Sequence, residues 1–224
     1  RMLTIKKLIA AIVIVLAAVT AFNWDNIVNL NKVITLFDKD KIVHNFVNMN
    51  ESFPNITIKS NSEPYYFESA PQALPESFEF KGKTVSVKEF LERTTTTALV
   101  VLKDETITHE SYYLDTKAED KRISWSVAKS FLSAMVGVAV EQGKIKSLND
   151  LVTDYAPSLK GSGYDGVTIK NILQMSSGVK FNEDYKDFFS DINRMGRLLA
   201  LGGSFDEFAA SLVAEREQGV YLHY

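Results

Sequence analysis

The stretch WSVAKSFLSAMVGVAV, residues 125–140, decides the fold. Its side chains are apolar on nearly all sides of a helix, so the sequence predicts a buried helix here. Ser126 and Lys129 nevertheless lie three residues apart at its start, and side chains at this spacing share one face of a helix. Because burial disfavours a charged ammonium, a neutral lysine would stand beside a serine hydroxyl. Such a pair is a general base beside a nucleophile.

A simpler interpretation of the same residues is a helix start with Ser126 as its cap and Lys129 extending to solvent. The pattern Ser-x-x-Lys also occurs a second time, at Ser177 to Lys180. There Gly178 interrupts the pattern, and the polar run of residues 182–184 follows in place of a helix. We therefore predict a turn at the second position and assign the chemistry to the first.

Residues 126–130, Ser-Val-Ala-Lys-Ser, resemble the nucleophile motif of the serine beta-lactamase and penicillin-binding-protein superfamily. Residues 123–125 and 141–145 are most similar to its esterase and amidase branch, which includes the 6-aminohexanoate-dimer hydrolases and class C-like enzymes. The resemblance covers most of the chain beyond about Phe53. It implies an α/β (α+β) fold, with an antiparallel sheet flanked by helices and a helical subdomain. It implies no cofactor and no metal.

The composition of the 224 residues is that of a globular protein, with 46% apolar and 24% charged side chains. A net charge of −3 without a large basic cluster argues against nucleic acid as a partner. The absence of cysteine excludes disulfides, thiol catalysis and cysteine-ligated zinc. The three histidines have no metal-ligand spacing, and no Gly-x-Ser-x-Gly motif supports a Ser-His-Asp triad.

The N-terminus carries a membrane signal. Lys6 and Lys7 precede an uncharged, almost wholly apolar run from Leu8 to Phe22. A cleaved signal peptide, with residues 19–21 as its cleavage site, is one interpretation. We favour an uncleaved anchor, although the run is slightly short, because an amphipathic helix continues directly from it. In both cases the rest of the chain is exported, either anchored to the inner membrane or secreted.

The chain is expected to divide into four parts. Residues 2–24 form the anchor or signal peptide, residues 25–50 amphipathic helices, residues 51–84 a proline-rich wrapping segment, and residues 85–224 the N-terminal part of the hydrolase domain. Within the last part we expect the following elements: a helix at 85–93, a β-hairpin with strands at 98–102 and 106–114, a helix capped by Thr168 that runs to Met175, and a helix that runs from a capping box at Ser204 to about Arg216.

The resemblance also implies roles for individual residues. Ser126 would be the nucleophile and Lys129 its base, with the Ser126 backbone N–H as half of the oxyanion hole. Tyr185 falls where a tyrosine of the 6-aminohexanoate-dimer hydrolase branch contacts the substrate. Tyr224 falls at the tyrosine that acts as acid and base. Tyr221 is the alternative candidate, but it lies closer to the preceding glycine turn and is expected to serve packing.

The second half of the oxyanion hole in this superfamily comes from a later strand with a Lys-Thr-Gly-like or His-x-Gly-like motif. No such strand precedes Tyr224, so we expect the chain to be part of a longer hydrolase and to have little or no turnover by itself. The predicted substrate is a small ester or amide. A beta-lactamase, a DD-peptidase or a non-catalytic penicillin sensor remain alternatives. We predict no oligomeric state.

Overall fold

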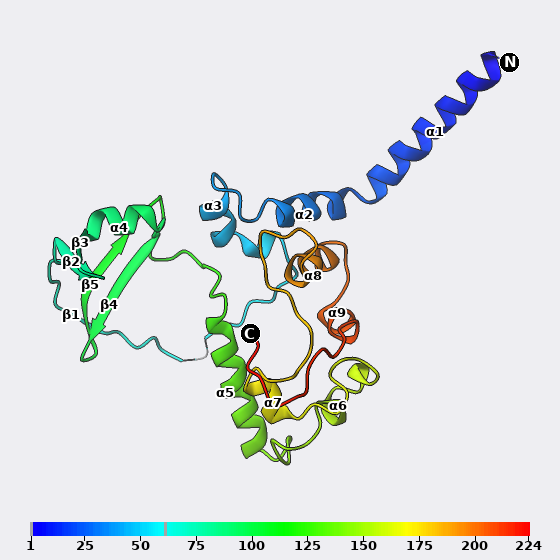
Figure 1. Ribbon diagram of the computed structural model, residues 1–224. Coiled ribbons are helices and arrows are strands. Elements are labelled where there is room, and N and C mark those ends of the chain that lie inside the picture. Colours follow the sequence, from blue (N-terminus) through cyan, green and yellow to red (C-terminus); the bar gives the residue numbers. More distant parts are fainter. Residues whose placement is uncertain (1, 61) are drawn as a thin grey trace. The chain divides into compact units, whose positions relative to one another are not determined.

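The structure, a computed structural model, describes residues 2–60 and 62–224 and has the predicted mixed α/β composition (Figure 1). The chain forms two compact units. The first comprises residues up to 37, residues 51–53 and residues 124–224. The second comprises residues 38–50 and 54–123. The domain boundaries expected from the sequence stay a prediction.

The second unit contains the predicted hairpin. Strand β4 (Ala98–Lys103) pairs antiparallel with β5 (Thr106–Tyr112), and the two-residue strand β1 (Glu68–Ser69) runs parallel beside β5. Both turn residues, Asp104 and Glu105, have positive φ angles of 49° and 59°, as tight hairpin turns require. The second strand ends two residues earlier than predicted because Leu114, with φ at +52°, leaves the extended conformation.

The helix predicted at residues 85–93 starts two residues later. Helix α4 spans Val87–Arg93, and its N-cap Ser86 accepts a hydrogen bond from the Glu89 backbone N–H at 3.3 Å. Val85 belongs instead to a second hairpin, formed by β2 (Ser77–Phe80) and β3 (Lys83–Ser86). Local capping chemistry therefore sets the start of the helix. Two short elements precede these strands, α3 (Ile42–Val47) and the 3-10 helix η1 (Met49–Glu51).

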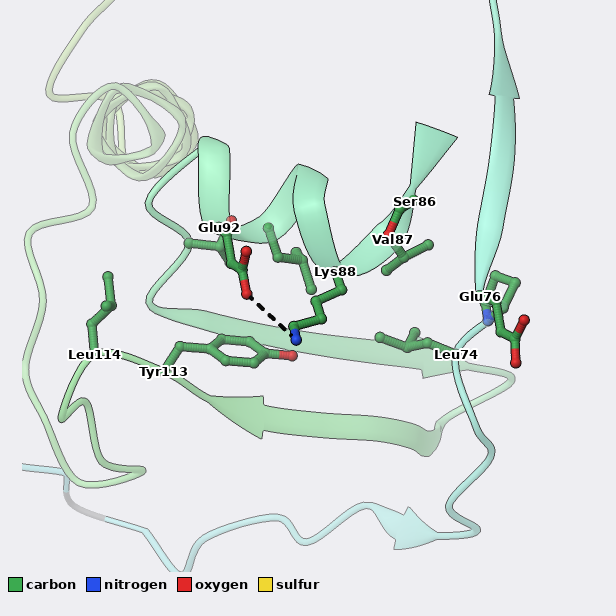
Figure 2. A pocket seen from close by; sticks show the side chains of 11 residues that line it. Leu74, Glu76, Ser86, Val87, Lys88, Glu92, Tyr113 and Leu114 are labelled. Atoms are coloured by element: carbon green, nitrogen blue, oxygen red, sulfur yellow. Dashed lines mark ion pairs between the residues drawn. The ribbon is translucent and has the colours of Figure 1, made fainter. Parts of the chain in front are cut away.

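A cavity of about 780 Å³ lies beside α4 in the second unit (Figure 2). Its walls are mostly apolar, and Lys88 and Glu92 form an ion pair of 3.9 Å on α4. The side chains of Tyr113 and Leu114, which follow β5, also line the cavity. None of the predicted site residues lines this cavity, although it is larger than the one beside Lys129 described below.

The first unit begins with two consecutive helices, α1 (Met2–Phe22) and α2 (Trp24–Ile34). The run Ile5–Phe22 has a mean hydropathy of 2.3 and is long and apolar enough to cross a membrane. Helix α2 is amphipathic, as predicted, and packs against α8 (Asp191–Ala200). Gly196 on α8 allows the close approach, because a Cβ atom there would lie 3.2 Å from the Val33 side chain.

Helix α5 (Val127–Glu141) occupies the predicted stretch and ends at a left-handed glycine, Gly143, as expected. The prediction that this helix is buried is wrong. None of its residues is buried, and the side chains of Phe131 and Leu132 are 69% and 61% exposed. The reason is its place in the fold, since α5 lies at the edge of its unit (Figure 1). Lys129 on this helix lines a cavity together with residues from the rest of the unit.

The remaining elements of the first unit are short: α6 (Val152–Tyr155), the 3-10 helix η2 (Pro157–Leu159), α7 (Ile169–Leu173) and α9 (Phe205–Ala210). Thr168 caps α7 as predicted by accepting from the Asn171 N–H at 3.1 Å. The helix stops at Leu173, before the predicted end at Met175, because Met175 has a φ of +52°.

The predicted capping box is present at the start of α9, where Ser204 and Glu207 bond each other's backbone N–H groups. The helix ends at Ala210, however, and not near Arg216. Beyond it the backbone bonds other segments: Leu212 O accepts from Gly163 N–H at 2.7 Å, and Val213 O accepts from Lys180 N–H at 2.9 Å. These long-range hydrogen bonds replace the helical ones.

The buried core of this unit joins α9 to the segment after α7. Val179, Phe208 and Leu212 are its buried members. Partly buried side chains pack around them, namely Tyr164, Phe181, Met195 and Leu198. The rings of Phe181 and Phe208 meet edge to face with their centroids 6.3 Å apart.

Gly178 permits the closest contact in this arrangement. Its φ is +75°, and a Cβ atom there would lie 2.3 Å from the Arg216 carbonyl oxygen. Gly161 has a nearly equal φ of +79° but has open space around it, so it is a matched control.

We expect Gly161→Ala to lower the free energy of unfolding by about 1–2 kcal/mol, the cost of a left-handed alanine. Gly178→Ala should add an overpacking cost of about 1–3 kcal/mol to this. Urea unfolding of both variants measures the difference. Equal unfolding midpoints would contradict the close packing of the segment at Gly178.

Candidate active site

Three polar side chains meet at the start of α5. The Lys129 Nζ atom lies 3.0 Å from Ser126 Oγ and 3.1 Å from the Tyr224 hydroxyl oxygen, and the Ser126 and Tyr224 hydroxyls are hydrogen-bonded to each other. Lys129 Nζ also lies 4.9 Å from the centroid of the Tyr224 ring. The structure thus brings together three of the four predicted site residues, although they span almost a hundred positions of the sequence.

The backbone before α5 aims Ser126 at this meeting point. Trp125 has a φ of +46°, a left-handed conformation that is unfavourable for a residue with a side chain. The chain then forms a tight turn in which the Ala128 N–H donates to Trp125 O and the Lys129 N–H to Ser126 O, both at 3.0 Å.

Ser126 occupies the N-cap position of α5, but its side chain makes no capping hydrogen bond. Its hydroxyl bonds Lys129 and Tyr224 instead. The simpler interpretation of the motif, with Ser126 as a cap and Lys129 extending to solvent, therefore holds in position and exposure but not in hydrogen bonding. Ser126 and Lys129 are nevertheless exposed, so the expected burial of the lysine amine is not observed.

Tyr224 reaches the site because the C-terminal segment is held by the turn that follows α7. The Gly219 N–H donates to Ser176 O at 2.8 Å and the His223 N–H to Met175 O at 2.7 Å. The Gln218 side chain donates to Gly166 O at 2.8 Å. Tyr221, the alternative candidate, lies elsewhere, with its ring centroid 5.9 Å from the Arg216 guanidinium.

The second Ser-x-x-Lys motif is a turn, as predicted. The Ser177 Oγ accepts a hydrogen bond from the Val179 N–H at 3.2 Å, and Gly178 has the left-handed conformation. The hydrogen bond that this hydroxyl makes is therefore a local one that shapes the loop.

Tyr185, the fourth predicted site residue, does not bond the other three. Its hydroxyl donates to the Glu183 carboxylate at 2.8 Å, and its ring contacts those of Phe37 and Trp125. The contact with Phe37 was not predicted, because its only signal in the sequence is an aromatic residue at the end of an amphipathic helix. The bond from Tyr185 to Glu183 was not predicted either.

The pKa values of the two tyrosines, Tyr185 and Tyr224, are shifted in opposite directions. Partial burial, together with the hydrogen bond to Glu183, raises the pKa of Tyr185 to about 12. The hydrogen bond with Ser126, followed by that with Lys129, lowers the pKa of Tyr224 below its usual value near 10. Of the two hydroxyls, Tyr224 is therefore the one suited to exchange a proton.

A cavity of about 320 Å³ lies beside Lys129 and Tyr224. Its polar lining includes the side chains of Glu183, Ser177 and His223. Its remaining walls are mostly apolar, formed by Tyr164, Ile172, Met175, Val179, Phe181, Ile192 and Met195. In the described part of the chain, no group of three or more His, Asp or Glu side chains could hold a metal ion.

The chain is similar to known proteins in sequence and in fold. A family model for beta-lactamases matches residues 86–224. The 6-aminohexanoate-dimer hydrolase of Paenarthrobacter ureafaciens is 33% identical over 111 residues, which are 50% of this chain and 28% of that protein. The structure of a proposed 6-aminohexanoate-dimer hydrolase from Bacillus anthracis superposes with a TM-score of 0.71 at 19% identity, over 84% of this chain and 52% of the other.

The chain thus spans about a quarter of the length of the first relative and about half that of the second. The structural likeness concerns the fold. The family match covers well over half of the residues, including Ser126, Lys129 and Tyr224. The chain therefore belongs to the beta-lactamase family.

Proposed function

We propose that the protein is a serine hydrolase that cleaves esters or small amides through an acyl-enzyme. The observation that carries this proposal is the meeting of Ser126, Lys129 and Tyr224, in which each side chain is hydrogen-bonded to both of the others. A nucleophile, a base and a proton donor within hydrogen-bond reach are what acyl transfer needs. The similarity to a 6-aminohexanoate-dimer hydrolase supports the amidase and esterase branch.

The reaction follows from these positions. Lys129 accepts the proton from Ser126 as the Oγ atom attacks the substrate carbonyl. Tyr224 donates its proton to the leaving alkoxide or amine, the carbonyl re-forms, and an ester of Ser126 remains. Water then attacks this ester and gives up a proton to the Tyr224 oxygen. As the bond between the acyl carbon and Ser126 Oγ breaks, Lys129 returns its proton to Oγ, and the acid is released.

Charge that develops on the carbonyl oxygen needs donors in fixed positions. The backbone N–H of Ser126, at the first turn of α5, is one candidate donor, because the start of a helix carries partial positive charge. Loss of one such donor costs about a hundredfold or more in rate.

The cavity beside Lys129 supports a small substrate. Its volume of about 320 Å³ lies at the lower end of the range for ligand pockets, and its walls are mostly apolar. We assign the cavity to an apolar part of the substrate next to the scissile bond. Tyr185 reaches this cavity only indirectly, through its bond to Glu183, so it would act on the substrate as a neighbour of the site.

Helix α1 supports attachment to a membrane, or export, by its length and hydropathy. Because Lys6 and Lys7 lie at its N-terminal end, the catalytic part would face the side of the membrane away from the cytoplasm. The hydrolase part would then correspond to the predicted residues 85–224.

The roles of Ser126 and Lys129 can be tested with p-nitrophenyl acetate and the complete protein. Ser126→Ala and Lys129→Met should each lower kcat/KM at least about a thousandfold, because they remove the nucleophile and its base. Ser133→Ala changes an exposed serine on the same helix and should leave the rate unchanged.

Mass spectrometry after reaction with a fluorophosphonate should place the covalent adduct on Ser126. Ester hydrolysis that persists in Ser126→Ala, or an adduct on another serine, would show that the nucleophile is assigned wrongly. Nitrocefin, run in parallel, separates the alternatives: fast turnover indicates a beta-lactamase, and a stable adduct without turnover indicates a penicillin sensor.

The tyrosine assignment predicts a pH dependence. An absorbance titration at 295 nm should show one tyrosine ionising below its usual pKa, and Tyr224→Phe should remove that step. Tyr185→Phe should remove a step at about pH 12. As the proton donor in acylation, Tyr224 should cause kcat/KM for an amide substrate to fall as the pH rises through its lowered pKa. If the rate of Tyr224→Phe fell with pH in the same way, another group would be the donor of the proton to the leaving group.

A further inference from the structure

Three aromatic rings from distant parts of the chain meet next to the site. Phe37 stacks on Trp125 with centroids 5.7 Å apart and an interplanar angle of 22°. The same ring meets Tyr185 edge to face at 5.2 Å, and Trp125 and Tyr185 lie 6.5 Å apart. We call these residues the ring cluster. Phe37 makes the two shorter contacts of the three.

Trp125 and Tyr185 are each connected to a different part of the proposed catalytic site. Trp125 directly precedes Ser126 and holds a left-handed backbone conformation, with φ at +46°. Tyr185 is bonded to Glu183, which lines the cavity beside Lys129. A ring placed between Trp125 and Tyr185 therefore contacts both the turn that aims the nucleophile and the loop that borders the cavity.

The position of Phe37 is itself fixed by α2. The chain after this helix is tied back to it, with the Thr35 N–H donating to Asn31 O at 3.0 Å and Leu36 N–H to Val33 O at 3.3 Å. Leu36 is buried, at 7% exposure. Helix α2 in turn packs against α8, and a cavity of about 200 Å³ between them is lined by Phe37 and Tyr185.

We infer that Phe37 is a positioning residue for the reaction, which acts by holding Trp125 and Tyr185 in place. This inference rests on the proposed function and extends it to the N-terminal part of the chain. The segment after the membrane helix is then a part of the catalytic unit as well as a connection to α1. A nucleophile shifted by about 1 Å loses about a hundredfold in rate, so support of the Ser126 turn matters for catalysis.

The first test measures the ring contact without activity. The chain has two tryptophans, so Trp24→Phe leaves Trp125 as the single fluorescent reporter. In this background Phe37→Ala should shift the emission of Trp125 to longer wavelength, because the ring loses its stacked partner. Ile34→Ala, which shortens an aliphatic neighbour in the same cavity, should leave the emission unchanged. An unchanged emission in Phe37→Ala would overturn the inference.

The second test measures p-nitrophenyl acetate hydrolysis per Ser126 labelled by the fluorophosphonate, so that loss of folded protein does not count. Phe37→Ala should lower kcat about tenfold to a hundredfold and leave KM nearly unchanged. Phe37→Tyr should restore kcat to within about threefold because it keeps the ring, whereas Phe37→Leu should not. Restoration by leucine, or a loss in KM alone, would overturn the positioning role. Absence of turnover in the unsubstituted protein would contradict the proposed function and leave the fluorescence test decisive.

Discussion

The backbone pairing between the turn after α7 and the C-terminal segment is the interaction on which the site depends. Ser126 and Tyr224 are 98 residues apart in sequence, and their hydroxyls meet because residues 175–178 bind the backbone of residues 215–223. Gly178 makes this possible, since any side chain would collide with the Arg216 carbonyl. Without this pairing, the serine and lysine at the start of α5 would lack their contact with the Tyr224 hydroxyl.

The backbone at Trp125, just before α5, is strained, and two kinds of contact stabilise it. Trp125 adopts a conformation that costs about 1–2 kcal/mol for a residue with a side chain, and the energy must come from its surroundings. Hydrogen bonds within the first turn of α5 supply part of it, and aromatic contacts with Phe37 and Tyr185 supply another part. Burial of α5 does not contribute to this stabilisation, because the helix has no buried residue.

Local signals in the sequence predicted local structure well. Capping residues located the starts of the helices after Thr168 and Ser204, and the residues 103–105 located the hairpin turn. The failures concern contacts between distant segments. The helix after Ser204 ends six residues early because its continuation bonds Gly163 and Lys180, which no local pattern reveals. The contacts of the Phe37 ring were missed for the same reason, because its partners Trp125 and Tyr185 lie 88 and 148 positions further along the chain.

The placement of Phe37 bears on the signal-peptide interpretation of the N-terminal run. A peptidase that cut after residues 19–21 would release the protein from the lipid bilayer and discard most of α1. Helix α2 and Phe37 lie beyond that cut, so the mature product would keep every residue of the ring cluster. The anchored precursor and the released form would therefore share one and the same supporting framework around Ser126.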